Sequence, residues 1–142
     1  MLVRLMYASR ASASLDQEEL HTLLRQCKAE NPKHGITGVL CLSQGIFMQV
    51  LEGGRMAVNQ LYNRIAADSR HTDVVLLDYA EIRERRFAGW AMGQVNLQRL
   101  NPAILLKYSE TPTLDPYSVS GQVSMALFEE LVATASIMGE RG

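Results

Sequence analysis

Gly45-Ile-Phe-Met-Gln-Val-Leu-Glu52 is the stretch that decides the fold of this chain. Apolar side chains fill both sets of alternating positions up to residue 51, which predicts a strand covered on both faces. Gln49 alone departs from this pattern. A buried amide without hydrogen-bond partners costs about 1–3 kcal/mol. We therefore expect a polar group to meet Gln49 inside the protein.

The preceding segment, residues 36–42, is the expected partner of this strand. Ser43-Gln-Gly45 has turn chemistry and is short, so segments 36–42 and 45–52 should form an antiparallel hairpin. Residues 2–8 also alternate, and their odd positions, which include Tyr7, should face the core.

Two further strands are expected, at residues 73–79 and near residues 91–97. Two helices lie between the strands. The first ends before Asn31-Pro32, and a capping box at its start pairs either Ser14 with Gln17 or Asp16 with Glu19. Apolar residues at helical spacing mark the two helices, namely Leu20, Leu23, Leu24 and Cys27 in the first and Val58, Leu61, Tyr62 and Ile65 in the second, which runs up to Asp68.

The element order βαββαββ predicts an α+β, ferredoxin-like sandwich with both helices on one face of the sheet. The other face is apolar too, so another part of the chain should cover it. Asn101-Pro102 has the chemistry of a helix start, and a helical stripe follows. The members of that stripe are Val123, Leu127, Leu131, Ala135 and Met138. We expect these C-terminal helices to pack on the second face.

Composition narrows the class of protein. The chain has 142 residues, 47% of them hydrophobic, and a formal net charge of -1, which suit one folded unit without a field for nucleic acid or membrane. No apolar run approaches the length of a membrane span and no secretory signal is evident, so we expect a cytoplasmic protein. Cys27 and Cys41 lack metal-ligand spacing and are interpreted as small core residues. We expect no metal site.

Tyr7 and Gln49 should meet in the cleft between the sheet and the helices. A cleft lined by apolar side chains and a few convergent polar groups suits a flat heteroaromatic ligand, and Asn31 could complete its polar edge. The apolar lining expected is Leu23, Leu24, Val58, Leu61 and Ile65. The residues alone leave a simpler interpretation open, in which Tyr7 and Gln49 bond only to each other or to the backbone.

Five motifs in order together resemble the BLUF family, sensors of blue light using flavin. They are Leu5-Met-Tyr-Ala-Ser9, Asn31 before Gly35-Ile-Thr-Gly-Val-Leu40, Phe47-Met-Gln-Val-Leu-Glu-Gly53, Ile65-Ala-Ala-Asp-Ser-Arg-His71 and Arg86-Phe-Ala-Gly-Trp-Ala-Met92. The resemblance covers residues 1–97, the expected photosensor domain. Residues 98–142 resemble the C-terminal helical extension of short, single-domain members.

The resemblance implies FAD or FMN as the cofactor. It implies that Gln49 bonds the flavin near N5 and the C4 carbonyl, that Tyr7 bonds Gln49, and that Asn31 holds the pyrimidine edge. A tyrosine in contact can donate an electron and then a proton, and a glutamine can rotate or tautomerise to exchange donor for acceptor. We interpret the hydroxyl of Ser9 as part of a turn.

The resemblance also places the flavin tail at the end of the second helix, near Arg64, Asp68, Arg70 and His71. Guanidinium groups suit phosphate, although Arg70 and His71 could equally belong to a solvated helix end. His21 and His34 are expected at exposed polar positions.

Trp90 and Met92 are two residues apart on one expected strand. Both could point at the flavin side, or a shift could exchange which one does. Trp90 could instead simply anchor the core.

The sequence is thus interpreted as a flavin-binding blue-light receptor rather than an enzyme. It would signal to a separate output protein, such as an enzyme of cyclic-nucleotide signalling, and would form a homo-oligomer. One alternative is a small flavin reductase or acylphosphatase-like hydrolase on the same fold, with Arg4, Arg10 and Asn31 as candidates. Another is an interaction module without a ligand.

Overall fold

Strand β3 (Ile46–Gly54) lies at the centre of a six-stranded sheet with the order β4-β1-β3-β2-β5-β6. The computed structural model describes residues 1–12, 16–95, 101–134 and 137–138. The other strands are β1 (Leu2–Ala11), β2 (Thr37–Ser43), β4 (His71–Ile82), β5 (Gly93–Val95) and β6 (Ile137–Met138). The helices are α1 (Gln17–Glu30), the 3-10 turn η1 (Asn31–His34), α2 (Arg55–Ala66), α3 (Pro102–Tyr108) and α4 (Gly121–Thr134).

The pairing of the strands confirms the predicted ferredoxin-like order. Strand β3 runs antiparallel to β1 and to β2, and Gln49 lies between Tyr7 on one side and Leu40 on the other. Strand β5 pairs with β2 in parallel, so the sheet is mixed. The sequence did not predict the short strand β6, which pairs with β5.

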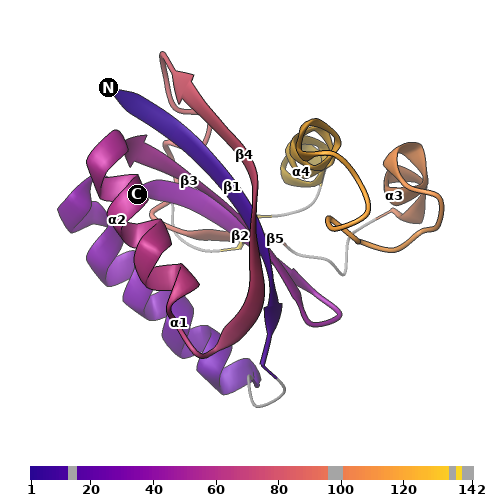
Figure 1. Cartoon of the computed structure of the whole chain (residues 1–142), viewed down its shortest axis with the longest axis horizontal. Helices are drawn as coiled ribbons and strands as arrows, with labels where there is room; N and C mark the ends of the chain where they lie inside the picture. The colour runs from indigo at the N-terminus through magenta and orange to yellow at the C-terminus, as the bar shows by residue number, and fades with distance from the viewer. Residues whose placement is uncertain (13–15, 96–100, 135–136, 139–142) are drawn as a thin grey trace.

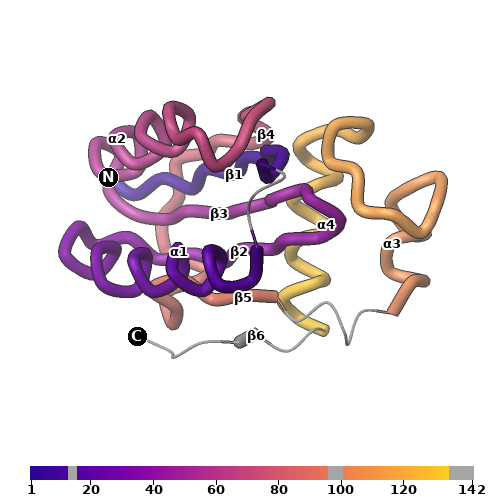
Figure 2. Tube along the Cα trace, turned by 90° about the horizontal axis from the view of Figure 1, so that it is seen from below, coloured from indigo at the N-terminus to yellow at the C-terminus, as the bar shows by residue number. Residues whose placement is uncertain are grey.

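Helices cover both faces of the sheet, as the apolar pattern of β3 predicted. Helices α1 and α2 lie on one face, and α4, with α3 beyond it, lies on the other (Figure 1). The view from below shows the same three layers (Figure 2). The front core, between the sheet and α1 and α2, contains Val3, Leu5, Tyr7, Leu20, Leu24, Ile36, Leu40, Phe47, Leu51, Val58 and Met92. The rear core, between the sheet and the C-terminal helices, contains Met6, Val39, Met48, Val50, Phe87, Leu127, Phe128 and Leu131, among others.

Several element boundaries differ from the sequence predictions. Helix α4 ends at Thr134, and Met138 lies in β6, so the predicted helical stripe does not extend to Met138. Ala135 and Ser14 lie outside the described residues. Asp16 caps α1, because its carboxylate accepts from the backbone N–H of Glu19 at 2.8 Å.

A buried carboxylate ties the loop after β4 to the central strand. Glu52 is fully buried and accepts hydrogen bonds from the backbone N–H groups of Arg86 at 3.0 Å and Phe87 at 2.7 Å. Arg4, its cross-strand neighbour on β1, supplies the countercharge at 2.8 Å. A buried charge with this many partners is well satisfied, so it holds residues 86–87 firmly against β3.

Among the described residues, no helix is long and apolar enough to cross a membrane.

The start of α4 lies directly against the backbone of β4. A Cβ added at Gly121 would lie 1.7 Å from the carbonyl oxygen of Leu77, so only glycine allows this approach. We expect Gly121→Ala to displace α4 and to lower the free energy of unfolding by about 1–3 kcal/mol in a denaturant titration. Gly54→Ala is the control, because a Cβ there meets nothing within 4 Å. Equal stabilities for the two variants would contradict the close approach.

Candidate functional site

A cavity of about 230 Å³ opens between the sheet and helices α1 and α2. Its walls are largely apolar, from Leu23 on α1, Ile36, Leu40 on β2, Phe47 on β3, and Leu61 and Ile65 on α2. Three polar side chains, Tyr7, Asn31 and Gln49, also line it. The cavity therefore has flat apolar walls and a polar edge, as a heteroaromatic ligand requires.

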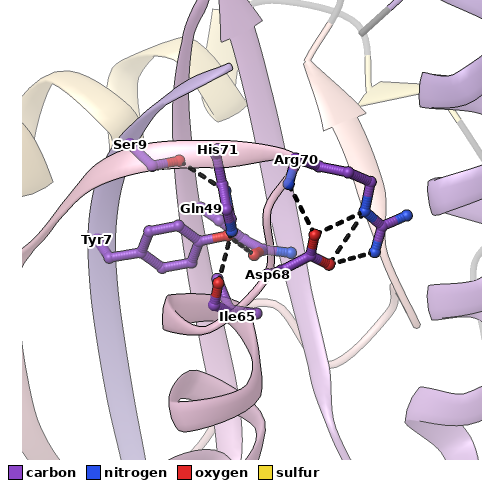
Figure 3. Close-up of polar contacts among 7 residues, drawn as sticks. All are labelled: Tyr7, Ser9, Gln49, Ile65, Asp68, Arg70 and His71. Atoms are coloured by element: carbon purple, nitrogen blue, oxygen red, sulfur yellow. Dashed lines mark hydrogen bonds and ion pairs between the residues drawn. The ribbon is translucent and has the colours of Figure 1, made fainter. Parts of the chain in front are cut away.

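Gln49 is held from both ends of its amide. The Tyr7 hydroxyl donates to Gln49 Oε1, and Gln49 Nε2 donates to the sulfur of Met92 at 3.2 Å (Figure 3 shows the first of these bonds). Gln49 is 5% exposed and Tyr7 is 3% exposed. The polar partner expected for Gln49 is thus present. The two bonds differ in strength, because a thioether sulfur is only a weak acceptor.

Burial keeps the Tyr7 phenol in its protonated form. It raises the pKa of Tyr7 far above its ordinary value, and the nearby groups Cys27, Tyr62 and Asp68 add to the shift in the same direction. Tyr7 is therefore a hydrogen-bond donor throughout the physiological pH range.

Asn31 lies where α1 passes into the 3-10 turn, as the sequence predicted. It is 4% exposed, and its Nδ2 donates to the carbonyl oxygen of Ala91 at 2.8 Å. A carboxamide has a second N–H hydrogen and a carbonyl oxygen as well, so Asn31 can both donate to and accept from a ligand in the cavity.

His71 links the sheet to the end of α2. Its Nε2 lies 2.6 Å from the carbonyl oxygen of Ile65 and its Nδ1 lies 2.9 Å from the hydroxyl of Ser9 (Figure 3). A carbonyl only accepts, so Nε2 carries the proton, and in the neutral ring Nδ1 accepts from Ser9. Ser9 is a buried residue of β1, so the interpretation of its hydroxyl as part of a turn is wrong.

Asp68 and Arg70 form a local ion pair beside His71. The Arg70 Nε lies 3.0 Å from both carboxylate oxygens of Asp68, and the Arg70 backbone N–H donates to Oδ1 at 2.9 Å. This contact lowers the pKa of Asp68 and raises that of Arg70. The pair fixes the turn after α2 with one charge of each sign.

All nine residues predicted to bind the cofactor line the same cavity. They are Tyr7, Leu23, Asn31, Gln49, Arg64, Ile65, Asp68, Arg70 and His71. Arg64 is exposed, so its side of the cavity faces solvent. Leu24 and Val58, also expected in the lining, are instead buried in the front core.

Trp90 and Met92 pack on opposite sides of the sheet. Met92 belongs to the front core, whereas Trp90 packs against the rear core. The expectation that both share one face is wrong, because residues 91–92 form a bend and regular pairing begins only at Gly93. Neither residue lines the cavity.

Further lining residues were missed or interpreted differently from sequence. Phe47 could have been found by alternation, since it lies two positions before Gln49 on β3. Gln26, Cys27 and Glu30 follow Leu23 at spacings of three, four and seven on α1 and also line the cavity. His34 is exposed, as expected, and lines the cavity as well.

The residues proposed for the alternative enzyme are not assembled into a site. Arg4 is paired with the buried Glu52, and Arg10 lies 3.3 Å from Asp73 and stacks over the ring of Tyr117. Neither arginine lines the cavity. Among the described residues there is also no cluster that could hold a metal ion.

The family described as BLUF, sensors of blue-light using FAD, matches residues 2–93. The chain belongs to this family. It is a blue-light sensor with a flavin cofactor, FAD or FMN, and not an enzyme.

Curated relatives are photoactivated adenylate cyclases. The beta subunit from Euglena longa is 38% identical over 92 residues, which are 64% of this chain and 11% of that protein. The alpha subunit from Euglena gracilis is 40% identical over 84 residues, which are 59% of this chain and 8% of that protein. This chain therefore spans about a tenth of the length of these relatives.

Solved structures of similar size match nearly the whole chain. The photo-activated state of BlsA has a TM-score of 0.83 at 30% identity and covers 97% of this chain and 100% of its own. BlrB in the dark state has a TM-score of 0.77 at 30% identity, covering 93% of this chain and 95% of its own. BlrP1 of Klebsiella pneumoniae, solved with FMN and cyclic diGMP, has a TM-score of 0.68 at 27% identity; the match covers 96% of this chain and 31% of that one.

The raised pKa of Tyr7 predicts that this phenol does not ionise in the folded protein. An unfolded tyrosine ionises near pH 10.0, so above that pH the native state binds more protons and stability falls as pH rises. In protein labelled with 13C-tyrosine, the Cζ resonance that disappears in Tyr7→Phe should stay fixed until alkaline unfolding. The resonance that disappears in Tyr79→Phe is the control and should move, since Tyr79 is 39% exposed. Movement of the Tyr7 resonance in the folded protein would contradict the prediction.

Proposed function

We propose that the cavity residues hold the flavin and that light is reported by a change in the hydrogen bonds of Gln49, which a separate output protein detects. The observation that supports this proposal is the buried Tyr7–Gln49–Met92 chain beside the cavity.

The lining residues fit a flavin. Leu23, Phe47 and Ile65 offer apolar walls to a tricyclic ring, and Asn31 and Gln49 offer amides to its polar edge. Arg64 and Arg70 offer guanidinium groups for a phosphate on the tail, although Arg70 is already paired with Asp68. When bound, the flavin supplies absorption of blue light and a site that accepts an electron and a proton.

Tyr7 and Gln49 supply the switch. Tyr7 donates its hydroxyl proton to Gln49 Oε1, so proton movement from Tyr7 is directed at the amide. Rotation of the amide by half a turn would bring Nε2 to the Tyr7 oxygen, which would then accept. Oε1 would leave its donor and face Met92, whose sulfur has no hydrogen to give. The rotated state thus requires a new donor to Oε1 at the edge of the cavity.

The output protein is proposed by analogy with the relatives. The photoactivated adenylate cyclases and the BlrP1 structure with cyclic diGMP associate similar domains with cyclic nucleotides. We propose that residues 1–97 form the sensor, that residues 98–142 form an extension, and that the partner is an enzyme of cyclic-nucleotide signalling. Trp90 and Met92 stay in the proposal as the segment that leads from the sensor towards the extension.

A homo-oligomer also stays in the proposal. The edge strand β4 exposes apolar side chains, with Leu76 48% exposed and Val75 41% exposed, and a second copy of the chain could cover them.

The first expected result concerns colour. The purified protein should be yellow, and blue light should shift its flavin absorption slightly to the red, reversibly in darkness, because only the hydrogen bonds around the chromophore change. A light-minus-dark absorption spectrum measures this shift. A protein that takes up flavin but shows no shifted state would contradict the proposed switch.

The second expected result concerns roles. Tyr7→Phe and Gln49→Leu should each retain flavin and lose the red-shifted state, because each removes one link while leaving the apolar walls in place. Absorption spectra before and after illumination give both readings. Tyr62→Phe is a matched control for Tyr7→Phe, since the Tyr62 ring packs 5.8 Å from that of Tyr7 and its hydroxyl is not part of the Tyr7–Gln49–Met92 chain. A normal photocycle in either test variant means that the assigned chain is wrong.

A further inference from the structure

We infer that the dipeptide Arg86–Phe87 is a joint that couples the state of Gln49 and Met92 to helix α4, with Phe128 and Glu129 as the receiving residues. The inference rests on the proposed function, and it names the route by which the hydrogen-bond change at the site would reach the C-terminal helices.

The first side of the joint is its attachment to β3. Glu52, three residues after Gln49, binds the backbone N–H groups of Arg86 and Phe87 at 3.0 and 2.7 Å. Glu52 is fully buried, and so is its contact with the chain. Charge-assisted hydrogen bonds of this kind are roughly twice as strong as neutral ones. The backbone of the joint therefore follows any movement of β3.

The second side is the short path from the joint to Met92. The N–H of Trp90 donates to the carbonyl oxygen of Phe87 at 3.3 Å, and the carbonyl oxygen of Trp90 accepts from Gly38 on β2 at 3.0 Å. Asn31 binds the next carbonyl oxygen, that of Ala91, at 2.8 Å. Every residue from 90 to 92 thus contacts the sheet or the cavity lining, so a change at Gln49 and Met92 is transmitted to the backbone of this segment.

The third side is the contact with α4. The Phe87 ring meets the Phe128 ring edge to face, with 6.4 Å between centroids and 79° between planes, and both rings are buried. The side chain of Arg86 forms an ion pair with Glu129, the next residue of α4. Two adjacent residues of the joint therefore contact two adjacent residues of the helix, one through packing and one through charge.

The two contacts differ in strength. An edge-to-face pair of buried rings contributes about 0.5–1.5 kcal/mol beyond its burial, whereas an exposed ion pair contributes about 0–1 kcal/mol. Helix α4 is also fixed at its start, where Gly121 lies against the backbone of β4. The joint acts about 10 Å further along the helix. Movement at the joint would thus turn α4 about a fixed end.

Hydrogen exchange in the dark and under steady blue light tests the joint in the full chain loaded with flavin. The unmodified protein should show a light-dependent difference in amide exchange across residues 121–134. Glu129→Gln should reduce that difference by about twofold, because it removes the weaker contact. The double variant Phe128→Leu with Glu129→Gln should remove most of it. All variants should retain the red-shifted spectrum, because none of these residues contacts the cavity.

Matched controls separate coupling from simple loosening of the helix. Leu127→Met with Glu130→Gln changes one buried and one acidic residue of the same helix; Glu130 pairs with Lys107 and Tyr108 of α3, not with the joint. This control should keep the full light-dependent difference. A double test variant with an undiminished difference overturns the joint, as does a control that loses it equally. If the double test variant does not fold, Glu129→Gln alone decides, and an unchanged difference overturns the joint.

The outcome also distinguishes the joint from the proposed function. A red-shifted state in the unmodified protein with no light-dependent difference in residues 121–134 overturns the joint alone. The absence of any red-shifted state overturns the proposed function, and the joint with it.

Discussion

Strand β3 is buried on both faces and yet carries two polar side chains, and the rest of the structure depends on how each is matched. Gln49 faces the front core and Glu52 the rear side of the sheet, and each meets its cross-strand neighbour on β1, Tyr7 for the amide and Arg4 for the carboxylate. A slip of one residue between β1 and β3 would leave both polar groups without these partners. Polar matching therefore fixes the same register that the apolar pattern favours.

Local patterns sufficed for the framework of the fold and for most of the candidate site. The alternation in residues 2–8 and 45–52 correctly placed Tyr7 and Gln49 on the front face, because side-chain direction in a regular strand depends only on position. The apolar rear positions of β3 likewise predicted the C-terminal cover. Asn31 followed from the helix exit before Pro32. In each case the deciding interaction lies within one turn or one strand.

The errors fall where a bend or a distant contact decides. Trp90 and Met92 separate to opposite sides because the chain bends before β5, and nothing in the local spacing marks that bend. The hydroxyl of Ser9 finds His71, 62 residues away, through the pairing of β1 with β4. Strand β6 forms only because the chain returns from α4 to β5. Contacts of this length depend on the assembled sheet.

The unequal bonds of Gln49 explain how one amide can have a defined resting orientation and still be a switch. A buried hydroxyl donor holds Oε1, while Nε2 has only the weak acceptor of Met92. Because reversal would sacrifice the stronger bond, the protein alone favours a single orientation. Reversal becomes favourable only when Tyr7 ceases to donate or when the cavity supplies a donor to Oε1. Burial enforces this condition, since no water is present at full strength to replace the missing partner. The amide therefore changes state only in response to Tyr7 and to what occupies the cavity.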